Sequence, residues 1–216
     1  MRKALLFALM LTLLLTACGG EEKKDPAAAL QAEYAAVASA DMEADITCHY
    51  DNEVRQYTLL CAYTPESSLV TVLAPEDLAG ISAEVKAGEL ILRYDDISLD
   101  AVSYSAAAVS PVAVLPSLME AAAAGYGTEV SEESLNERQC LRMSCDLSED
   151  LGTVYTTWFD QETLLPLRSE VCVDGTVVYE VVWNRFAVTE KLEQPSPEEP
   201  GDGVENSITE DQPAAG

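Results

Sequence analysis

The central part of the chain alternates between apolar and polar residues with a period of two, which is typical of strands with one buried face. Two such stretches, Met42–Tyr50 and Arg55–Tyr63, stand on either side of a polar turn at Asn52–Glu53. Pairing them about that turn puts the apolar residues of both strands on the same face, so the pattern predicts a β-hairpin. The predicted cross-strand pairs are Ile46 with Leu59, Cys48 with Tyr57 and Ala44 with Cys61.

The same alternation predicts a second hairpin, with its turn at Ala87–Gly88. A pair of opposite charges would close its polar end next to the turn. The predicted pairs are Val85 with Leu90, Ala83 with Leu92, Ile81 with Tyr94 and Lys86 with Glu89.

Further strands are expected on both sides of this region. A short one is predicted at Ser68–Leu73, before a turn at Pro75–Asp77. The dipeptide Asp174–Gly175 is a strong signal for a two-residue hairpin turn. The later strands are predicted at Arg138–Leu147, Thr153–Asp160, Leu167–Val173 and Thr176–Val188.

Two alanine-rich helices complete the pattern. Apolar residues at helical spacing predict the first over Ala27–Ala40. The second would begin with Ser110 as N-cap and Pro111 at the first helical position, and run to about Ala124, where Gly125 ends it. About eight strands and two helices make a mainly β (α+β) fold.

A single antiparallel sheet with one apolar face must cover that face, and these two helices are available to cover it. A strongly curved sheet beneath them would leave an apolar cleft of the kind that binds ligands. The alternative is a fully packed core without a cavity. The residues predicted to line such a cleft are Ile46, Cys48, Tyr57, Leu59, Leu90, Leu92 and Met143.

The N-terminus has the form of a secretory signal. The basic segment Met1–Lys3 precedes thirteen uncharged, leucine-rich residues, Ala4–Thr16, which are fewer than the roughly 20 needed to span a bilayer. Leu15–Cys18 resembles the bacterial lipobox, in which the cysteine becomes the new N-terminus and carries the lipid. The alternative is an ordinary signal peptide in which Cys18 merely lies near the cleavage site.

Lipidation of Cys18 predicts attachment to the extracytoplasmic face of the cell membrane. Two or more acyl chains anchor a protein stably, at about 0.8 kcal/mol per buried CH₂, without help from basic residues. Cleavage before Cys18 would remove Arg2 and Lys3 and so change the net charge from −26 to −28. Such acidity favours solubility and spacing from an anionic membrane.

The chain divides into a signal peptide and, in the mature protein, three zones of different composition. Residues 1–17 are the expected signal peptide, 18–26 the lipidated cysteine with a polar tether, and 27–192 the folded domain. Residues 193–216 hold four prolines and seven acidic residues, with no basic or aromatic side chain. This composition predicts an acidic, disordered tail, with an acidic docking arm as the alternative.

Composition also narrows the classes of function. The balance of 38 acidic to 12 basic residues argues against nucleic-acid binding and against adhesion to anionic lipid by charge. The single histidine, His49, lies on the polar face of its strand and excludes multi-histidine metal sites. No zinc, nucleophile-elbow, phosphate-loop or calcium-loop spacing occurs, and Asp95–Asp96 and Glu132–Glu133 fit solvated turns. We expect neither a cofactor nor enzymatic activity.

Five cysteines follow the lipidation site, an odd number, so at least one is free or pairs between chains. The predicted register holds Cys48 and Cys61 beyond the Cα limit of about 7 Å for a disulfide. Cys140 and Cys145 would face opposite ways, and Cys140 and Cys172 would have a strand between them. Buried or surface thiols are therefore expected.

Several stretches resemble the bacterial lipoproteins that share the fold of the outer-membrane lipoprotein-sorting chaperone, LolA. They are Leu69–Pro75 with Ile81–Ala83, Gly88–Asp96, and above all Thr157–Glu170, where Trp-Phe-Asp, a turn, Leu-Pro and a charged strand follow one another. The resemblance spans roughly residues 40–188. It implies an incomplete antiparallel β-barrel whose apolar concave face, covered by helices, holds acyl chains or docks a partner.

Within this group the chain looks most like the lipid-anchored germination lipoproteins of spore-forming bacteria, known as GerS. One departure is informative: the sorting chaperone shuttles its cargo, whereas a chain tethered through Cys18 cannot travel far. The first hypothesis is therefore a membrane-anchored protein that binds a hydrophobic ligand such as an acyl lipid. The second is a non-catalytic scaffold that docks a partner protein, and an enzyme is the least favoured.

Overall fold

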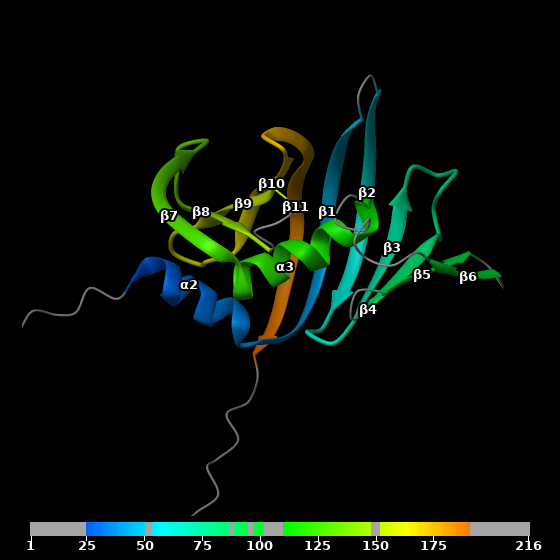
Figure 1. The fold of residues 1–216 in the computed structure, drawn as a ribbon, viewed down its shortest axis with the longest axis horizontal. Helices are drawn as coiled ribbons and strands as arrows, with labels where there is room; N and C mark the ends of the chain where they lie inside the picture. The colour runs from blue at the N-terminus through cyan, green and yellow to red at the C-terminus, as the bar shows by residue number, and fades with distance from the viewer. Residues whose placement is uncertain are drawn as a thin grey trace, which may run out of the picture.

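The computed structural model describes residues 25–50, 53–86, 89–94, 97–101, 110–147 and 152–190. In this part of the chain, one eleven-stranded antiparallel sheet is accompanied by two α-helices and one 3₁₀ turn (Figure 1). The elements are α2 (Pro26–Ala35), β1 (Val37–Tyr50), β2 (Glu53–Tyr63), β3 (Ser68–Ala74), β4 (Ser82–Lys86), β5 (Glu89–Tyr94), β6 (Ile97–Ala101), η2 (Pro111–Ala113), α3 (Val114–Ala124), β7 (Tyr126–Leu135), β8 (Arg138–Asp146), β9 (Thr153–Asp160), β10 (Pro166–Val173) and β11 (Thr176–Glu190).

The order of the strands explains why a helix crosses the sheet. The order is β6-β5-β4-β3-β2-β1-β11-β10-β9-β8-β7, so the first and last strands pair in the middle. The chain moves outward from β1 to one edge at β6 and returns inward from the opposite edge at β7. The segment between β6 and β7 must therefore cross a face of the sheet, and α3 lies across that face (Figure 1).

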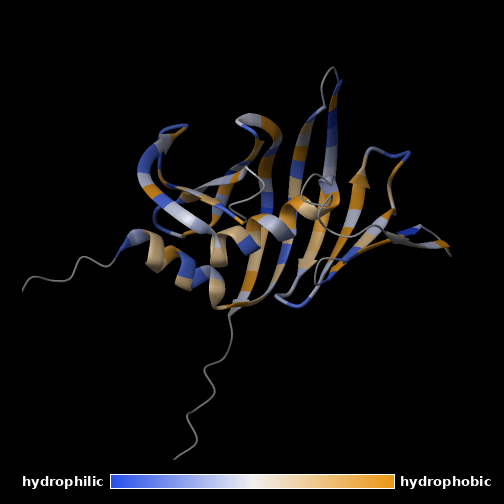
Figure 2. Ribbon diagram, in the orientation of Figure 1, coloured by the Kyte–Doolittle hydropathy of each residue, from blue (hydrophilic) through white to orange (hydrophobic). Residues whose placement is uncertain are grey.

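The face under α3, called the inner face, carries the apolar half of each alternating strand. Figure 2 shows this alternation along the strands. Eight of the eleven residues of α3 are buried, and they form one core with α2 and the inner face. The expected mainly β fold, a curved and incomplete barrel covered by two helices, is confirmed: in the described residues β6 and β7 are edges and do not pair with each other.

The first hairpin forms, but the predicted pairing is wrong by two residues. Tyr50 pairs with Glu53, so Ile46 lies opposite Tyr57 rather than Leu59. The register leaves Asp51 and Asn52 between the two strands, and Asp and Asn favour two-residue hairpin turns more strongly than Glu does. A displacement by two residues leaves every side chain on its predicted face. The corrected pairs are Ala44 with Leu59, Cys48 with Arg55 and Met42 with Cys61.

The second hairpin is confirmed. Its pairs are Val85 with Leu90, Ala83 with Leu92 and Lys86 with Glu89. The predicted pair of Ile81 with Tyr94 is wrong, because β4 begins only at Ser82. The backbone N–H of Ile81 donates to Leu78 O instead, at the end of the turn after β3.

Both predicted helices occur with different ends. The first ends at Ala35 instead of Ala40, because Val37 already pairs with Glu190 of β11. At the second, Ser110 makes no side-chain cap hydrogen bond, and a 3₁₀ turn with Pro111 at its first position precedes α3. Gly125 follows the last residue of α3, as expected.

Two strands were not predicted, β6 and β7. Most of β7 is exposed on both faces, so it lacks an apolar alternation. Its contact with α2 includes a polar one, in which the Gln31 amide donates to the Thr128 hydroxyl over 2.8 Å. Glu132 and Glu133 lie within this strand and not in a turn. β1 begins at Val37, five residues before the predicted start at Met42. The ends of the remaining strands agree with prediction to within two residues, and Asp174 and Gly175 both have positive φ, at 50° and 78°.

The five described cysteines are free thiols, as expected: Cys48, Cys61, Cys140 and Cys145 are buried, and Cys172 is half-buried. Burial raises the pKa of Cys48 to about 11 and that of Cys61 to about 12. Since the thiolate is the reactive form, these two side chains are inert core residues at neutral pH.

Neither helix in the described part of the chain is both long and apolar enough to cross a bilayer. The predicted signal peptide, the lipidation site Cys18 and the acidic tail lie outside the described residues, as do Asp95 and Asp96.

Candidate functional site

The structure brings all seven predicted lining residues to the inner face, where they are part of the core or pack against it. Ile46, Cys48, Leu59, Leu90 and Met143 are buried. Tyr57 and Leu92 are partly buried against the same core. Most of these side chains are therefore packed in the core at the place where the sequence predicted an open cleft. Ile46 and Tyr57 also border a groove of about 420 Å³ at the end of β3.

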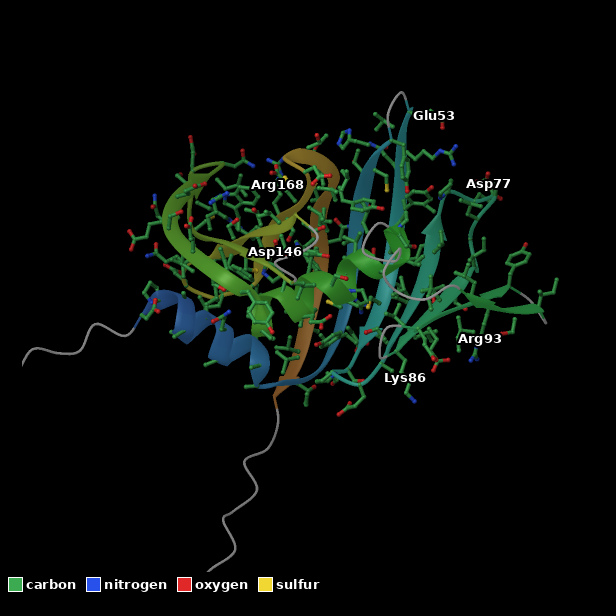
Figure 3. All side chains as sticks on the ribbon, in the orientation of Figure 1. Glu53, Asp77, Lys86, Arg93, Asp146 and Arg168 are labelled. Carbon is green, nitrogen blue, oxygen red and sulfur yellow. The ribbon has the colours of Figure 1, made fainter. Side chains whose placement is uncertain are left out.

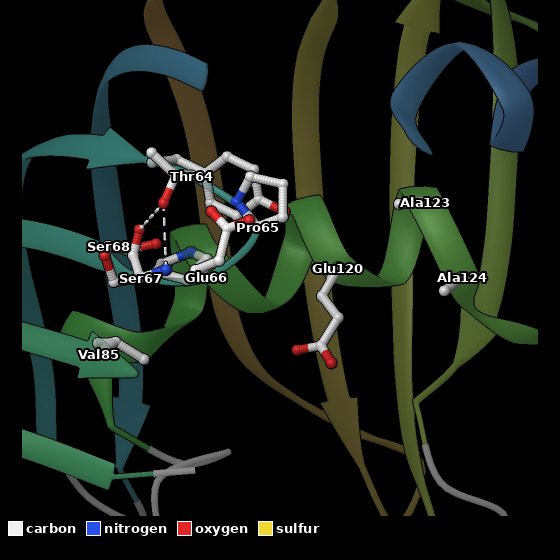
Figure 4. Close-up of a pocket in the computed structure, with 11 residues that line it drawn as sticks. Thr64, Pro65, Glu66, Ser67, Ser68, Val85, Glu120, Ala123 and Ala124 are labelled. Carbon is white, nitrogen blue, oxygen red and sulfur yellow. Dashed lines mark hydrogen bonds between the residues drawn. The ribbon is translucent and has the colours of Figure 1, made fainter. Parts of the chain in front are cut away.

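A second groove, which the sequence did not predict, lies between α3 and the turn from β2 to β3 (Figure 4). It has a volume of about 480 Å³, within the range of about 300–1,000 Å³ typical of ligand pockets. We call it the α3 groove. Its lining residues are Tyr63, Thr64, Pro65, Glu66, Ser67, Ser68, Val85, Pro116, Glu120, Ala123 and Ala124.

The turn on one side of the α3 groove is held by its own hydrogen bonds. Thr64 N–H donates to Ser67 O over 2.9 Å, and the Thr64 hydroxyl donates to the same oxygen over 2.8 Å. Ser67 N–H in turn donates to the Thr64 hydroxyl over 3.1 Å. These bonds, drawn in Figure 4, fix the turn as a preformed wall.

The other side of the groove carries the one charged residue of α3. Glu120 is exposed while its neighbours in the helix are buried, and it projects among the lining residues (Figure 4). Loss of solvation beside the apolar lining raises its pKa above the ordinary glutamate value. No cation lies within ion-pair distance of it among the described residues. A shifted and unpaired carboxylate in a groove marks a candidate functional site.

Tyr63 supports this interpretation of the groove. Burial raises the pKa of its phenol, and the nearby carboxylate of Glu120 raises it further. The groove therefore joins an apolar floor to a negative rim made by Glu120 and Glu66, with no basic residue in its lining. The signal in the sequence was a lone glutamate inside an otherwise uncharged helix.

Replacing Glu120 with glutamine is expected to stabilise the protein slightly at neutral pH. A carboxylate whose pKa is raised by folding contributes stability below its unfolded pKa and loses it as the pH rises through the folded pKa. The gain should be at most about 0.5 kcal/mol, because the side chain is exposed. It should disappear well below the ordinary glutamate pKa, which urea denaturation across pH will measure. A gain that is equal at every pH would contradict this.

A different cluster occupies the outer face, opposite α3. The ring of Trp158 lies between the guanidinium groups of Arg142 and Arg168, at 5.7 and 5.6 Å from its centroid. Its indole N–H donates to Glu133 over 2.8 Å. Contacts of this kind stabilise neighbouring strands by cation–π attraction.

The same cluster continues toward the centre of the sheet. Arg168, labelled in Figure 3, donates to Glu170 over 2.6 Å and to Glu180 over 2.9 Å. The other oxygen of Glu180 lies 2.9 Å from His49 Nε2. Every charge named here has a partner within the cluster, so it forms a closed network that joins strands. His49 thus lies on the polar face, as predicted.

The described residues contain no group of three His, Cys, Asp or Glu side chains close enough to hold a metal ion.

The chain matches no protein-family profile and no curated protein sequence. It does share its architecture with solved structures. A LolA superfamily protein of Nitrosomonas europaea is 11% identical over 75% of this chain and 93% of its own, with a TM-score of 0.40. The lipoprotein LppX of Mycobacterium tuberculosis is 14% identical over 72% and 91%, with a TM-score of 0.35.

A third similar structure is the MucA/MucB complex of Pseudomonas aeruginosa, 10% identical over 77% of this chain and 58% of that one, with a TM-score of 0.39. Similarity this distant concerns the arrangement of strands and helices. It carries no information about ligand, partner or anchor for this chain, which must be argued from its own residues.

Proposed function

We propose that this protein is a lipid-anchored protein of the extracytoplasmic membrane face that binds the alkyl chain of a lipid in the α3 groove. The observation that carries the proposal is the groove itself: about 480 Å³ between a buried helix and a hydrogen-bonded turn. Its floor offers Val85, Pro116 and Ala123 to an apolar chain. The proposed binding site is therefore the groove at the edge of α3, and not the centre of the inner face, where the sequence predicted a cleft and the structure is packed.

Filling the groove tests the proposal. Ala123 is half-buried in its lining, and tryptophan in its place would occupy the space of the ligand. With the full chain in membranes, a photoreactive long-chain alcohol should label residues 63–68 and 116–124, and Ala123→Trp should reduce that labelling by at least tenfold, as peptide mass spectrometry will measure.

The matched control is Ala32→Trp, an exposed alanine of α2 outside the groove. It should leave the labelling unchanged. If the two tryptophan variants behave alike, or if the alcohol never labels the groove, lipid binding at this site is excluded.

The anchor is tested separately. Cys18→Ala should release the protein from the membrane, because the proposed lipid on this residue is what anchors it. Immunoblots of membrane and medium fractions will measure the distribution. Retention of the variant in the membrane would show that the lipobox interpretation is wrong. Cys18→Ser is the second replacement to compare, and it should be released equally.

A docking role is the second candidate, and the exposed edge strand β7 favours it. An edge strand presents main-chain groups that can pair with an extended partner, and β7 is ten residues long. A stoichiometric protein partner that survives Ala123→Trp and slows hydrogen exchange along β7 would decide for this role.

A further inference from the structure

All the charged side chains in the lining of the α3 groove are acidic. Its two titratable carboxyl groups, Glu120 and Glu66, come from opposite walls, and no Lys, Arg or His is among its lining residues. Glu120 has no ion-pair partner among the described residues. An alkyl chain seated against Val85 and Ala123 would hold its head close to these carboxylates.

An anionic head would meet repulsion there. A carboxylate, sulfate or phosphate would have like charges beside it and no donor with positive charge in the lining. A neutral head would neither gain nor lose much. A head that carries an ammonium group would gain charge-assisted hydrogen bonds to carboxylate oxygens, which are stronger than neutral ones.

We propose that the α3 groove binds a lipid whose head bears an amine and is cationic, with Glu120 as the residue that recognises it. This specificity rests on the proposed lipid-binding function and adds the class of headgroup to it. The acidity of the whole chain, at −26, supports the capture of such a ligand by attracting cations toward the surface.

The experiment compares three photoreactive probes of equal alkyl length that end in an ammonium, a hydroxyl or a carboxylate group. Each is applied to the full chain in membranes of neutral lipid, and labelling of residues 63–68 and 116–124 is quantified. We expect the ammonium probe to label most and the carboxylate probe least. Glu120→Gln should weaken ammonium labelling about fivefold, and Glu120→Lys should turn the preference toward the carboxylate probe.

The matched control is Glu162→Gln, in the exposed turn after β9, which changes the net charge by the same amount outside the groove. It should leave all three probes unchanged. If Glu162→Gln weakens ammonium labelling as much as Glu120→Gln, the attraction comes from overall charge and the assignment to Glu120 is overturned. If the alcohol and ammonium probes label equally and Glu120→Gln has no effect, the headgroup proposal fails while lipid binding stands. If no probe labels the groove, lipid binding fails with it.

Discussion

Replacing Phe159 with alanine is expected to lower the free energy of unfolding by about 3–5 kcal/mol, the range for a large aromatic removed from a core. Phe159 is only 1% exposed, and its ring meets that of Tyr34 edge to face at a centroid distance of 5.0 Å. Tyr34 comes from α2, so the variant leaves a cavity at the joint between this helix and the sheet. Urea denaturation of the full chain will measure the loss.

The control for this prediction lies on the same strand. Val154 of β9 points to the outer face and is 38% exposed, so Val154→Ala should cost no more than about 0.5 kcal/mol. Hydrogen exchange gives an independent readout, because Tyr34 also donates from its hydroxyl to Leu164 O over 2.9 Å. The backbone amides of α2 should exchange faster in Phe159→Ala than in the unsubstituted protein, and this increase should be larger than that of the strands at the centre of the sheet. A loss like that of Val154→Ala would show that α2 does not depend on this ring.

The stretch that carried the family resemblance has a physical explanation in the structure. Trp158 points outward between two arginines, whereas Phe159 points into the core, so alternation puts the two aromatic residues to different uses. Asp160 accepts hydrogen bonds from the backbone N–H and the hydroxyl of Thr163 and from the backbone N–H of Glu162. These bonds hold the turn to β10 and lower the pKa of the aspartate. The outward tryptophan, the buried phenylalanine and the aspartate that holds the turn are adjacent in the chain, so these structural roles appear as a short sequence motif.

Side-chain alternation was enough to predict which residues face the core, because successive residues of a half-buried strand point alternately to the core and to solvent. It was not enough to predict the register of the first hairpin, since pairings two residues apart bury the same side chains. Nor could it find β7, an edge strand whose faces are both largely exposed. The central pairing of β1 with β11 depends on contacts between the two ends of the chain.

The position of the α3 groove could not be predicted from the sequence for a related reason. The sequence indicated an apolar face and covering helices, and the predicted cleft was placed at the centre of that face. In the structure the centre is filled, because α3 buries most of its own side chains there. Space remains at the side of the helix, where Glu120 and the turn after Tyr63 line the same groove. A crossing helix thus fills the middle of a curved sheet and leaves room at its flank.

Replacing Gly125 with alanine is expected to destabilise the protein by about 1–3 kcal/mol, the usual cost of overpacking a core. Gly125 has ordinary extended backbone angles, φ −60° and ψ 146°, so alanine meets no conformational barrier there. The cost is steric: an added Cβ would lie 2.5 Å from Cys145 Sγ and 2.6 Å from Ala121 O. Ala121 is in the last turns of α3, and Cys145 is in β8.

A double-mutant cycle in urea denaturation separates the two contacts. Cys145→Ala removes the sulfur but leaves its Cβ, which would lie 2.7 Å from the new methyl group. Combining it with Gly125→Ala should therefore recover part of the loss and not all of it. Full recovery would show that Ala121 O can move away from the new methyl group without cost. No recovery would show that the sulfur is not what opposes the methyl group.

Because Ala123 and Ala124 line the α3 groove, displacement of the end of α3 from β8 by this methyl group should also weaken labelling of the groove. Phe159→Ala acts through α2, so it should leave that labelling unchanged in the folded protein.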